Sequence, residues 1–313
     1  MVPHIPGRRT GADVRKLLIS GGTGFVGKHL CRVLVNDYEV WGLTRRLPDT
    51  TNGHAGVHWL VHDLTSAQWP TAMPSRLDAI VHLAQSDAYQ EFPGGAADMF
   101  NVNTFGTMRL LDLARRTDVE TFVHVSTGGI YGSGLHPFKE TDGFHPSDRL
   151  RHYLTTKYAA ELMVTNFSAL FTTVILRPFF IYGTGQATGK LIPRLITRVD
   201  RGDPITLHGE EGIRINPIHV SDTVAAITGA LDLRQALVAN IAGPEVWCLR
   251  DMVLTIGREL GRTPVFEVDA INAPLHCVAD LAVMTLKLGA PKVRFAEALR
   301  EICREYAAGP SRR

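Results

Sequence analysis

Short runs of apolar residues recur along the first half of the chain, and amphipathic segments of helical length separate several of them. The runs lie at residues 17–19, 40–43, 57–60, 79–83, 121–125 and 172–176, and the helical segments include residues 103–116 and 153–170. Strands of a parallel sheet are wholly apolar in this way because helices cover both of its faces. The pattern predicts an α/β fold with a doubly wound parallel sheet.

The alternation loosens after residue 178. A glycine-rich loop occupies residues 183–189, helices are predicted at 190–199, 222–233 and 249–260, and short strands at 205–207 and 238–241. This half is smaller and more irregular than the first half. It predicts a second, smaller α/β lobe at the carboxyl-terminal side.

Composition excludes several classes of protein. The 313 residues are 45% hydrophobic, and 33 Lys plus Arg against 31 Asp plus Glu leave a net charge of +2, so no basic surface for nucleic acid is indicated. The chain has no apolar stretch of about 18 residues, so no membrane span is predicted. Four scattered cysteines lack metal-binding spacing, which favours reduced thiols, no metal site and a cytoplasmic protein.

Three glycines at equal spacing follow the first apolar run and open the first helical segment. Gly21, Gly24 and Gly27 form a G-x-x-G-x-x-G pattern. Glycines here allow a tight turn, close approach of a pyrophosphate and close packing of helix on strand. The helix amino terminus then offers free N–H groups to phosphate. The context predicts a Rossmann-type dinucleotide site rather than a turn without a ligand.

The end of the second strand indicates which dinucleotide binds. A carboxylate is expected there for the ribose hydroxyl of NAD, but this chain has Thr44, Arg45 and Arg46. Guanidinium groups suit a 2′-phosphate, so NADP(H) is favoured and NAD(H) remains possible. The alternative is a solvated surface pair. Asp63 is expected to hold the adenine amino group, to cap a helix, or both.

A phenol and an ammonium lie four residues apart, at Tyr153 and Lys157, on one face of a predicted helix. The cation, with the positive nicotinamide ring, is expected to lower the pKa of the phenol so that it exchanges a proton with a hydroxyl or carbonyl. Thr127 follows a predicted strand and is expected to hydrogen-bond the reacting oxygen, with Ser126 towards the nicotinamide. The alternative for Thr127 is a turn hydroxyl that satisfies backbone groups.

These residues and several later motifs resemble the extended short-chain dehydrogenase/reductases, in particular the nucleotide-sugar epimerases, dehydratases and ketoreductases. The likeness covers residues 16–306. Beyond the glycine loop and the Tyr153/Lys157 pair, it includes the segments at 82–84, 101–107, 176–183, 214–222, 240–243 and 288–291.

The resemblance implies nucleotide contacts from Gly21, Gly24, Phe25, Val26, Gly27, Asp63, Leu64, Leu83, Ala84 and Asn103, with Phe179 near the nicotinamide. The complete predicted cofactor set adds Thr23, Thr44, Arg45, Arg46, Gln85, Ser126, Tyr153, Lys157 and Pro178. The catalytic residues would be Thr127, Tyr153 and Lys157. Substrate contacts are expected from Thr127, Phe180, Lys190 and Arg214, where Arg214 binds a diphosphate or forms an exposed ion pair.

Two departures from the family pattern narrow the expected chemistry. Gly128 and Gly129 stand where 4,6-dehydratases carry Asp and Glu, so dehydration and decarboxylation are disfavoured. Phe180 stands where many nucleotide-sugar enzymes carry an Asn that contacts the substrate. We therefore expect hydride transfer at carbon 4 of a nucleotide-activated sugar.

The preferred interpretation is an NADPH-dependent reductase of a nucleotide-linked 4-keto-6-deoxy sugar, because of Arg45 and Arg46. The alternative is a nucleotide-sugar 4-epimerase with tightly bound NAD. A reductase of another carbonyl substrate and a non-catalytic dinucleotide sensor are further alternatives. The resemblance also implies a homodimer.

The expected organisation has three parts: a flexible tail at 1–15, an NAD(P)-binding Rossmann domain at 16–178, and a substrate-binding lobe at 179–313. The resemblance implies that residues of about 216–243 return to the large domain.

Overall fold

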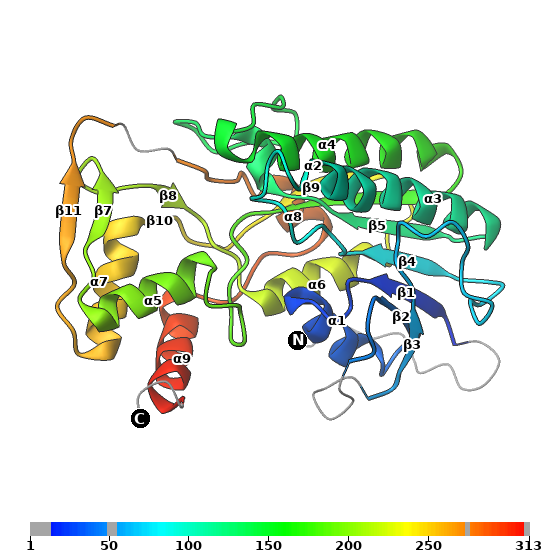
Figure 1. The fold of residues 1–313 in the computed structure, drawn as a ribbon, viewed down its shortest axis with the longest axis horizontal. Helices are drawn as coiled ribbons and strands as arrows, with labels where there is room; N and C mark the ends of the chain where they lie inside the picture. The colour runs from blue at the N-terminus through cyan, green and yellow to red at the C-terminus, as the bar shows by residue number, and fades with distance from the viewer. Residues whose placement is uncertain (1–13, 49–54, 273–275, 310–313) are drawn as a thin grey trace.

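A seven-stranded parallel sheet forms the centre of the larger part of the molecule (Figure 1). The computed structural model describes residues 14–48, 55–272 and 276–309, so the tail predicted at 1–15 lies outside the described residues except for residues 14 and 15. The strand order is β3-β2-β1-β4-β5-β6-β9. The strands are β1 Lys16–Ser20, β2 Glu39–Thr44, β3 Val57–Val61, β4 Ala79–His82, β5 Thr121–Val125, β6 Thr172–Pro178 and β9 Leu237–Ile241. The predicted α/β fold is confirmed.

Helices cover both faces of this sheet (Figure 1). On one face lie α2 Ala96–Met99, α3 Gly106–Arg116 and α4 Arg151–Asn166, and on the other α1 Phe25–Leu34 and α6 Val220–Ala230. A π-helical segment, Phe100–Phe105, joins α2 to α3. It occupies the start of the helix predicted at 103–116. One helix, α8 Ala282–Lys287, also contacts β9.

Alternate side chains of each strand enter different cores. In β1, Leu17 and Ile19 join the core under α1 and α6, whereas Leu18 joins the core under α3 and α4. All three side chains are fully buried. The middle of a strand in a two-sided α/β sandwich is therefore continuously apolar, as residues 17–19 of β1 are.

The second lobe packs helices against two small sheets, on the left in Figure 1. Its helices are α5 Leu191–Arg201, α7 Leu249–Leu260 and α9 Phe295–Ala308. Its strands are β7 Ile205–His208, β8 Arg214–Ile215, β10 Trp247–Cys248 and β11 Phe266–Asp269. The pair β7/β11 is parallel and the pair β8/β10 antiparallel. The sequence analysis missed β8, β10, β11, α2, α8 and α9.

The strand order reverses between β1 and β4, because β2 lies on one side of β1 and β4 on the other. Strand β9 pairs with β6, so the chain comes back to the large sheet after β7 and β8. Crevices at such a reversal are where α/β sheets bind ligands, outside the carboxyl ends of the strands. In the described ranges, no helix has the length and apolar character that crossing a membrane requires.

Candidate active site

A cleft of about 740 Å³ opens at the carboxyl ends of β1, β4, β5 and β6. Most of the predicted site residues line it, although they come from distant parts of the sequence. They are Gly21, Thr23, Gly24, Phe25, Val26, Gly27, Thr44, Arg45, Asp63, Leu64, Leu83, Ala84, Gln85, Ser126, Thr127, Tyr153, Pro178, Phe180 and Lys190. The predicted residues Arg46, Asn103, Lys157, Phe179 and Arg214 are not in its lining.

The glycine loop forms the floor of the cleft between β1 and α1. Gly21 has a φ of +73°, and a Cβ atom there would lie 2.7 Å from the backbone nitrogen of Ala84. A Cβ atom on Gly27 would lie 2.2 Å from the carbonyl oxygen of Gly21. Both positions therefore need glycine, one for its conformation and both for close packing.

The amino terminus of α1 is open to an anion. Within residues 14–48, no side chain caps this helix, and its first turn holds no acidic residue. Its orphan N–H groups and positive dipole end lie beside the cleft-lining residues Gly24, Phe25 and Val26. These residues fit the pyrophosphate of a dinucleotide.

The end of β2 carries less free positive charge than its sequence suggests. Arg45 lines the cleft, but its guanidinium lies 2.7 Å from a carboxylate oxygen of Asp87, with side chains 68% and 84% exposed. Thr44 is buried, and its hydroxyl donates to the carbonyl of Arg46 at 2.6 Å. One of the two arginines thus has a counter-ion in the cleft wall.

Asp63 does not cap a helix, as one interpretation expected, because a turn follows it, and its contact with the adenine group stays a prediction. It lines the cleft, and its Oδ1 atom accepts hydrogen bonds from the backbone N–H and the hydroxyl of Thr65, both at 2.8 Å. These bonds hold the pKa of Asp63 below its ordinary value. The carboxylate is therefore ionised and fixed in the adenine half of the predicted dinucleotide site.

The hydroxyl of Tyr153 lies in the cleft wall and donates to Oε1 of Gln85 at 2.9 Å. One turn further along α4, the ammonium of Lys157 is 1% exposed and donates to the carbonyl of Val125 at 2.8 Å. Burial lowers the pKa of Lys157 to about 8, and the carboxylate of Glu161 opposes this shift. Helix α4 thus places Tyr153 in the cleft wall and Lys157 in the protein interior behind it.

The surroundings of Tyr153 in the described chain shift the pKa of its phenol upward. Burial and, second, the neighbouring phenol of Tyr89 raise the pKa of Tyr153. The physical reason is that Tyr153 is desolvated while Lys157 donates to a backbone carbonyl. The lowering that we expected depends on the nicotinamide charge as well as on Lys157, so it stays a prediction for the cofactor-bound enzyme.

Two hydroxyls follow β5, and they differ in their hydrogen bonding. The hydroxyl of Thr127 accepts from the backbone N–H of Gly129 at 3.1 Å, which caps the short 3₁₀ helix Gly128–Tyr131. The hydroxyl of Ser126 is buried, lines the cleft and has no hydrogen-bond partner among the residues that the structure describes. A buried donor at the wall of a cleft is available to a bound ligand.

The two phenylalanines after β6 point to different environments. Phe179 is 1% exposed and stacks on Tyr131, and a Cβ atom on Gly128 would lie 2.3 Å from its ring. Phe180 has a φ of +47°, is 37% exposed and lines the cleft. Phe179 therefore belongs to the core under the loop, and Phe180 is the side chain at the cleft.

Asn103 supports the site from behind. Its side chain is buried, accepts from the backbone N–H of Ser86 at 2.8 Å and donates to the hydroxyl of Thr156 at 3.0 Å. These bonds tie the connection after β4 to helix α4. They position the two segments that carry Gln85 and Tyr153.

Arg214 and Lys190 lie on the second lobe. Arg214 in β8 forms an exposed ion pair with Glu211, which is one of the two interpretations considered for it. Lys190, at the amino-terminal end of α5, donates to the hydroxyl of Tyr89 at 3.2 Å and lies over its ring. The contact between Lys190 and Tyr89 joins the second lobe to the connection after β4.

Sequence reasoning missed Asp87 and Asp98, which also line the cleft. Asp98 accepts a short hydrogen bond from the hydroxyl of Ser86, and Asp87 pairs with Arg45. No motif spacing marks either residue, because each reaches the cleft through the connection between β4 and α3.

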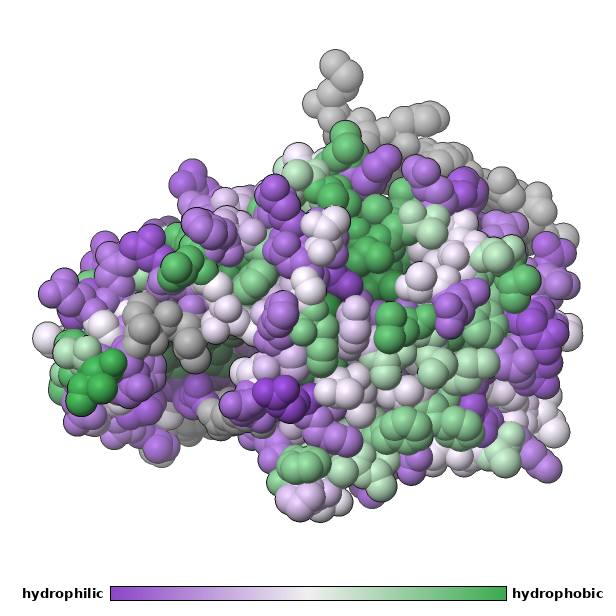
Figure 2. Space-filling view, turned by 90° about the horizontal axis from the view of Figure 1, so that it is seen from above, coloured by the Kyte–Doolittle hydropathy of each residue, from purple (hydrophilic) through white to green (hydrophobic). Residues whose placement is uncertain are grey.

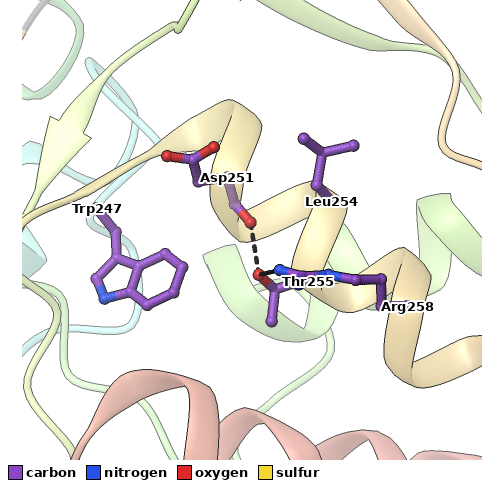
Figure 3. A pocket seen from close by; sticks show the side chains of 5 residues that line it. All are labelled: Trp247, Asp251, Leu254, Thr255 and Arg258. Atoms are coloured by element: carbon purple, nitrogen blue, oxygen red, sulfur yellow. Dashed lines mark hydrogen bonds between the residues drawn. The ribbon is translucent and has the colours of Figure 1, made fainter.

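A second, smaller hollow of about 430 Å³ lies along α7 in the other lobe (Figure 3). Its lining residues are Trp247, Asp251, Leu254, Thr255 and Arg258. Arg258 donates to the hydroxyl of Thr255, which in turn donates to the backbone carbonyl of Asp251. None of the predicted site residues lines this hollow.

In the described part of the chain, no cluster of three metal-ligating side chains occurs, and all four cysteines are buried and free.

Comparison with known proteins agrees with this geometry. The family model "NAD dependent epimerase/dehydratase family" matches residues 17–242. The chain belongs to this family of enzymes, and the resemblance to extended short-chain dehydrogenase/reductases is confirmed.

The individual relatives are distant. The chain is 26% identical to human dTDP-D-glucose 4,6-dehydratase over 71% of this chain and 67% of that protein. It is 27% identical to an uncharacterized UDP-glucose epimerase of Bacillus subtilis over 85% of this chain and 90% of that protein. The chain thus spans about two thirds of the length of the human dehydratase.

Among solved structures, MoeE5 in complex with UDP-glucuronic acid and NAD has a TM-score of 0.78 and 25% identity, over 93% of this chain and 99% of that one. Its similarity extends through both lobes. The fold is therefore shared well beyond the residues that the family model matches.

Proposed function

We propose that this chain is a nucleotide-sugar 4-epimerase that retains NAD. The observation that carries the proposal is the hydroxyl of Tyr153 in the same cleft as the glycine loop, with no carboxylate in the two positions after Thr127. MoeE5, solved with UDP-glucuronic acid and NAD, and the Bacillus subtilis relative named as a UDP-glucose epimerase support this choice. The sequence placed the epimerase second, after the ketoreductase.

NAD, when bound, supplies the acceptor and the donor of the hydride at carbon 4. The glycine loop and the start of α1 would hold its pyrophosphate, and Asp63 its adenine end. The free hydroxyl of Ser126 is placed to donate a hydrogen bond into the opposite half of the cleft.

The protein's own contribution to the reaction is proton transfer and positioning. Tyr153 takes the proton of the sugar hydroxyl at carbon 4 and returns one to the same oxygen. The charged ammonium of Lys157, one turn away on α4, favours the phenolate that accepts this proton. The hydroxyls of Ser126 and Thr127 would hold the sugar oxygen in reach.

Local packing disfavours a dehydratase. Water elimination needs an acid and a base, and the family positions for them are Gly128 and Gly129. A side chain on Gly128 would collide with the ring of Phe179, and a Cβ atom on Gly129 would lie 3.0 Å from Leu154. The carboxylates elsewhere in the described cleft wall are held by Thr65, Arg45 or Ser86.

A ketoreductase with NADPH is the second candidate, and Arg45 is the observation that favours it. The end of β2 offers a guanidinium to a 2′-phosphate and has no carboxylate of its own. The ion pair with Asp87 offsets part of that charge. We therefore place the NADP(H) reductase below the NAD epimerase.

The deciding experiment measures what the purified protein carries and what it converts. The nucleotide released on denaturation is identified, and the protein is then incubated with UDP- and dTDP-linked hexoses while carbon 4 is followed by NMR. We expect bound NAD and interconversion of the 4-epimers without net NADH formation. Oxidation of NADPH by a nucleotide-linked 4-keto-6-deoxy sugar, without epimerisation, would instead establish the reductase.

We also propose a homodimer through the face that carries α3 and α4. Figure 2 views the molecule from this side and shows hydrophobic side chains among polar ones. Phe100, Phe105 and Leu162 are each about half exposed there. Sedimentation equilibrium tests the dimer.

The cytoplasmic location and the domain boundaries stay predictions.

A further inference from the structure

Gln85 forms a hydrogen bond with Tyr153, the residue that transfers the proton in the proposed reaction. It lies in the connection after β4, and its Oε1 atom accepts the hydrogen bond of Tyr153, 68 positions further along the chain. Within the described chain, the Gln85 side chain has no other hydrogen bond, and it lines the cleft. Tyr153 is thus its one side-chain hydrogen-bond partner among the described residues.

The remaining surroundings of Tyr153 leave its oxygen without another side-chain partner among the described residues. The ring packs beside Tyr89, with ring centres 5.7 Å apart, and Lys157 donates to the Val125 carbonyl instead. The packed ring fixes the position of the phenolic oxygen, and the amide of Gln85 is the group towards which its O–H is directed.

An amide can serve this oxygen in both of its protonation states. Its oxygen accepts from the phenol, and a half-turn of the amide presents an N–H donor to the phenolate. Hydrogen bonds to a charged oxygen are shorter and about twice as strong as neutral ones. A carboxylate in the same place would accept from the phenol but repel the phenolate.

We propose that Gln85 is a positioning residue that accepts a hydrogen bond from Tyr153 as phenol and donates one to it as phenolate. This inference rests on the proposed epimerase function. It gives Gln85 a role towards the tyrosine in place of the cofactor contact that the sequence suggested.

Other charged and titratable groups face the same region and must be kept constant. Tyr89 lies on the Gln85 connection, Lys157 on α4 and Lys190 at the start of α5. Asp98 of α2 and the pair Arg45–Asp87 line the same cleft. The test therefore changes Gln85 alone and compares it with a neighbouring glutamine.

The first test is the pH profile of kcat/KM in the NAD-loaded enzyme. Gln85→Met removes the donor and the acceptor but keeps a side chain of similar length. We expect it to lower kcat about tenfold. We also expect the low-pH fall of kcat/KM, which we call the acidic limb, to move to higher pH by about one unit. KM should change less than about threefold, because the change affects the proton-transferring oxygen rather than uniform binding. Gln85→Glu should move the limb further upward through like-charge repulsion.

Gln90→Glu is the matched control. Gln90 is exposed in the same connection and is absent from the cleft lining, so it carries the same added charge away from Tyr153. We expect its profile to match the wild type. If the acidic limb of the kcat/KM profile lies at the same pH in Gln85→Glu, in Gln90→Glu and in the wild type, the proposal is wrong.

The second test needs neither substrate nor cofactor. The ultraviolet phenolate signal of Tyr153 is isolated as the difference between the chain and its Tyr153→Phe variant, with circular dichroism verifying the fold. At the highest pH at which circular dichroism still shows the native fold, we expect a smaller phenolate signal in Gln85→Met, and in Gln85→Asn, whose shorter amide cannot reach, than in the unchanged chain. An unchanged titration overturns the role of Gln85. If the wild type converts no nucleotide sugar but the titration shifts, the proposed function fails while the contact stands.

Discussion

One half of the cleft is formed mainly by backbone atoms, and the other half mainly by side chains. The half around the glycine loop is made of backbone, where Gly21 and Gly27 leave no room for a Cβ atom and α1 presents bare N–H groups. The opposite half is made of side chains, where the oxygen of Tyr153 meets Gln85 and the ammonium of Lys157 lies buried behind it. The first half is specified by shape, and the second by charge and hydrogen bonding. Substitutions in the first half should therefore disturb packing and nucleotide retention, whereas substitutions in the second half should disturb proton transfer.

The largest effect is expected from Tyr153→Phe, which removes the proton-transferring oxygen but keeps the ring. General acid–base groups contribute about 10²–10⁴ in rate, so we expect kcat/KM to fall about a thousandfold. The bound nucleotide and the unfolding midpoint should stay near those of the wild type.

Tyr158→Phe is the matched control for this change. Tyr158 lies on the same helix, and its ring stacks on Phe144 with centres 4.6 Å apart. Steady-state kinetics on both variants test the comparison. Equal activity of Tyr153→Phe and Tyr158→Phe would remove the tyrosine from the mechanism.

Lys157→Met should change how stability depends on pH. Burial lowers the pKa of Lys157 to about 8 from an ordinary 10.5, so the unfolded chain holds more protons between these values. The buried charge therefore destabilises the fold below about pH 8, and the penalty fades as the pH rises towards 10.5. Its full size is on the order of 3 kcal/mol.

The measurement is urea unfolding of the wild type and Lys157→Met at pH 7 and at pH 9.5. We expect the wild type to gain free energy of unfolding relative to the variant as the pH rises, because the other titrating groups are common to both chains. A difference that stays constant with pH would show that burial does not shift Lys157. Activity of the variant should also fall.

Gly27→Ala tests the half of the cleft that depends on shape. Its Cβ atom would lie 2.2 Å from the Gly21 carbonyl, so either α1 or the loop must move. We expect a loss of stability of about 1–3 kcal/mol, as in other overpacked sites, together with weaker NAD retention.

Gly189→Ala is the control for this change, since nothing lies within 4 Å of its Cβ position. Thermal unfolding and the nucleotide content of the two purified variants provide the readouts. Full NAD retention by Gly27→Ala would contradict the steric account of the loop.

The smallest effect is expected from Asp87→Asn, which sharpens the question of the cofactor. It releases Arg45 from an exposed ion pair, and such pairs contribute only about 0.2–1 kcal/mol. We expect NADP(H) to bind a few-fold more tightly, with little change for NAD. Fluorescence titration with both dinucleotides measures the ratio. An unchanged ratio would mean that Arg45 does not reach the 2′ position.

Local patterns predicted the strands and the principal helices well. The helix at 249–260 is observed as α7, and the apolar runs are observed as strands, fully buried in β4 and β5 but partly exposed in the edge strand β3. The π-helical start of α3 was missed, since its residues differ from α-helical ones only in backbone hydrogen bonding. Strands β8 and β10 were missed because two-residue strands carry no periodic signal, and the four-residue β11 was missed although its partner β7 was predicted.

The sequence alone determined what depends on neighbouring residues. A strand, three spaced glycines and a helix specify the glycine loop, and four residues of helix place Tyr153 and Lys157 on one side. Only the tertiary structure decided the contacts made across distant segments: Gln85 with Tyr153, Asp87 with Arg45, and Phe179 beneath Gly128. Helix periodicity and turn geometry act over a few residues and can be read locally. The meeting of distant side chains depends instead on how the whole chain packs.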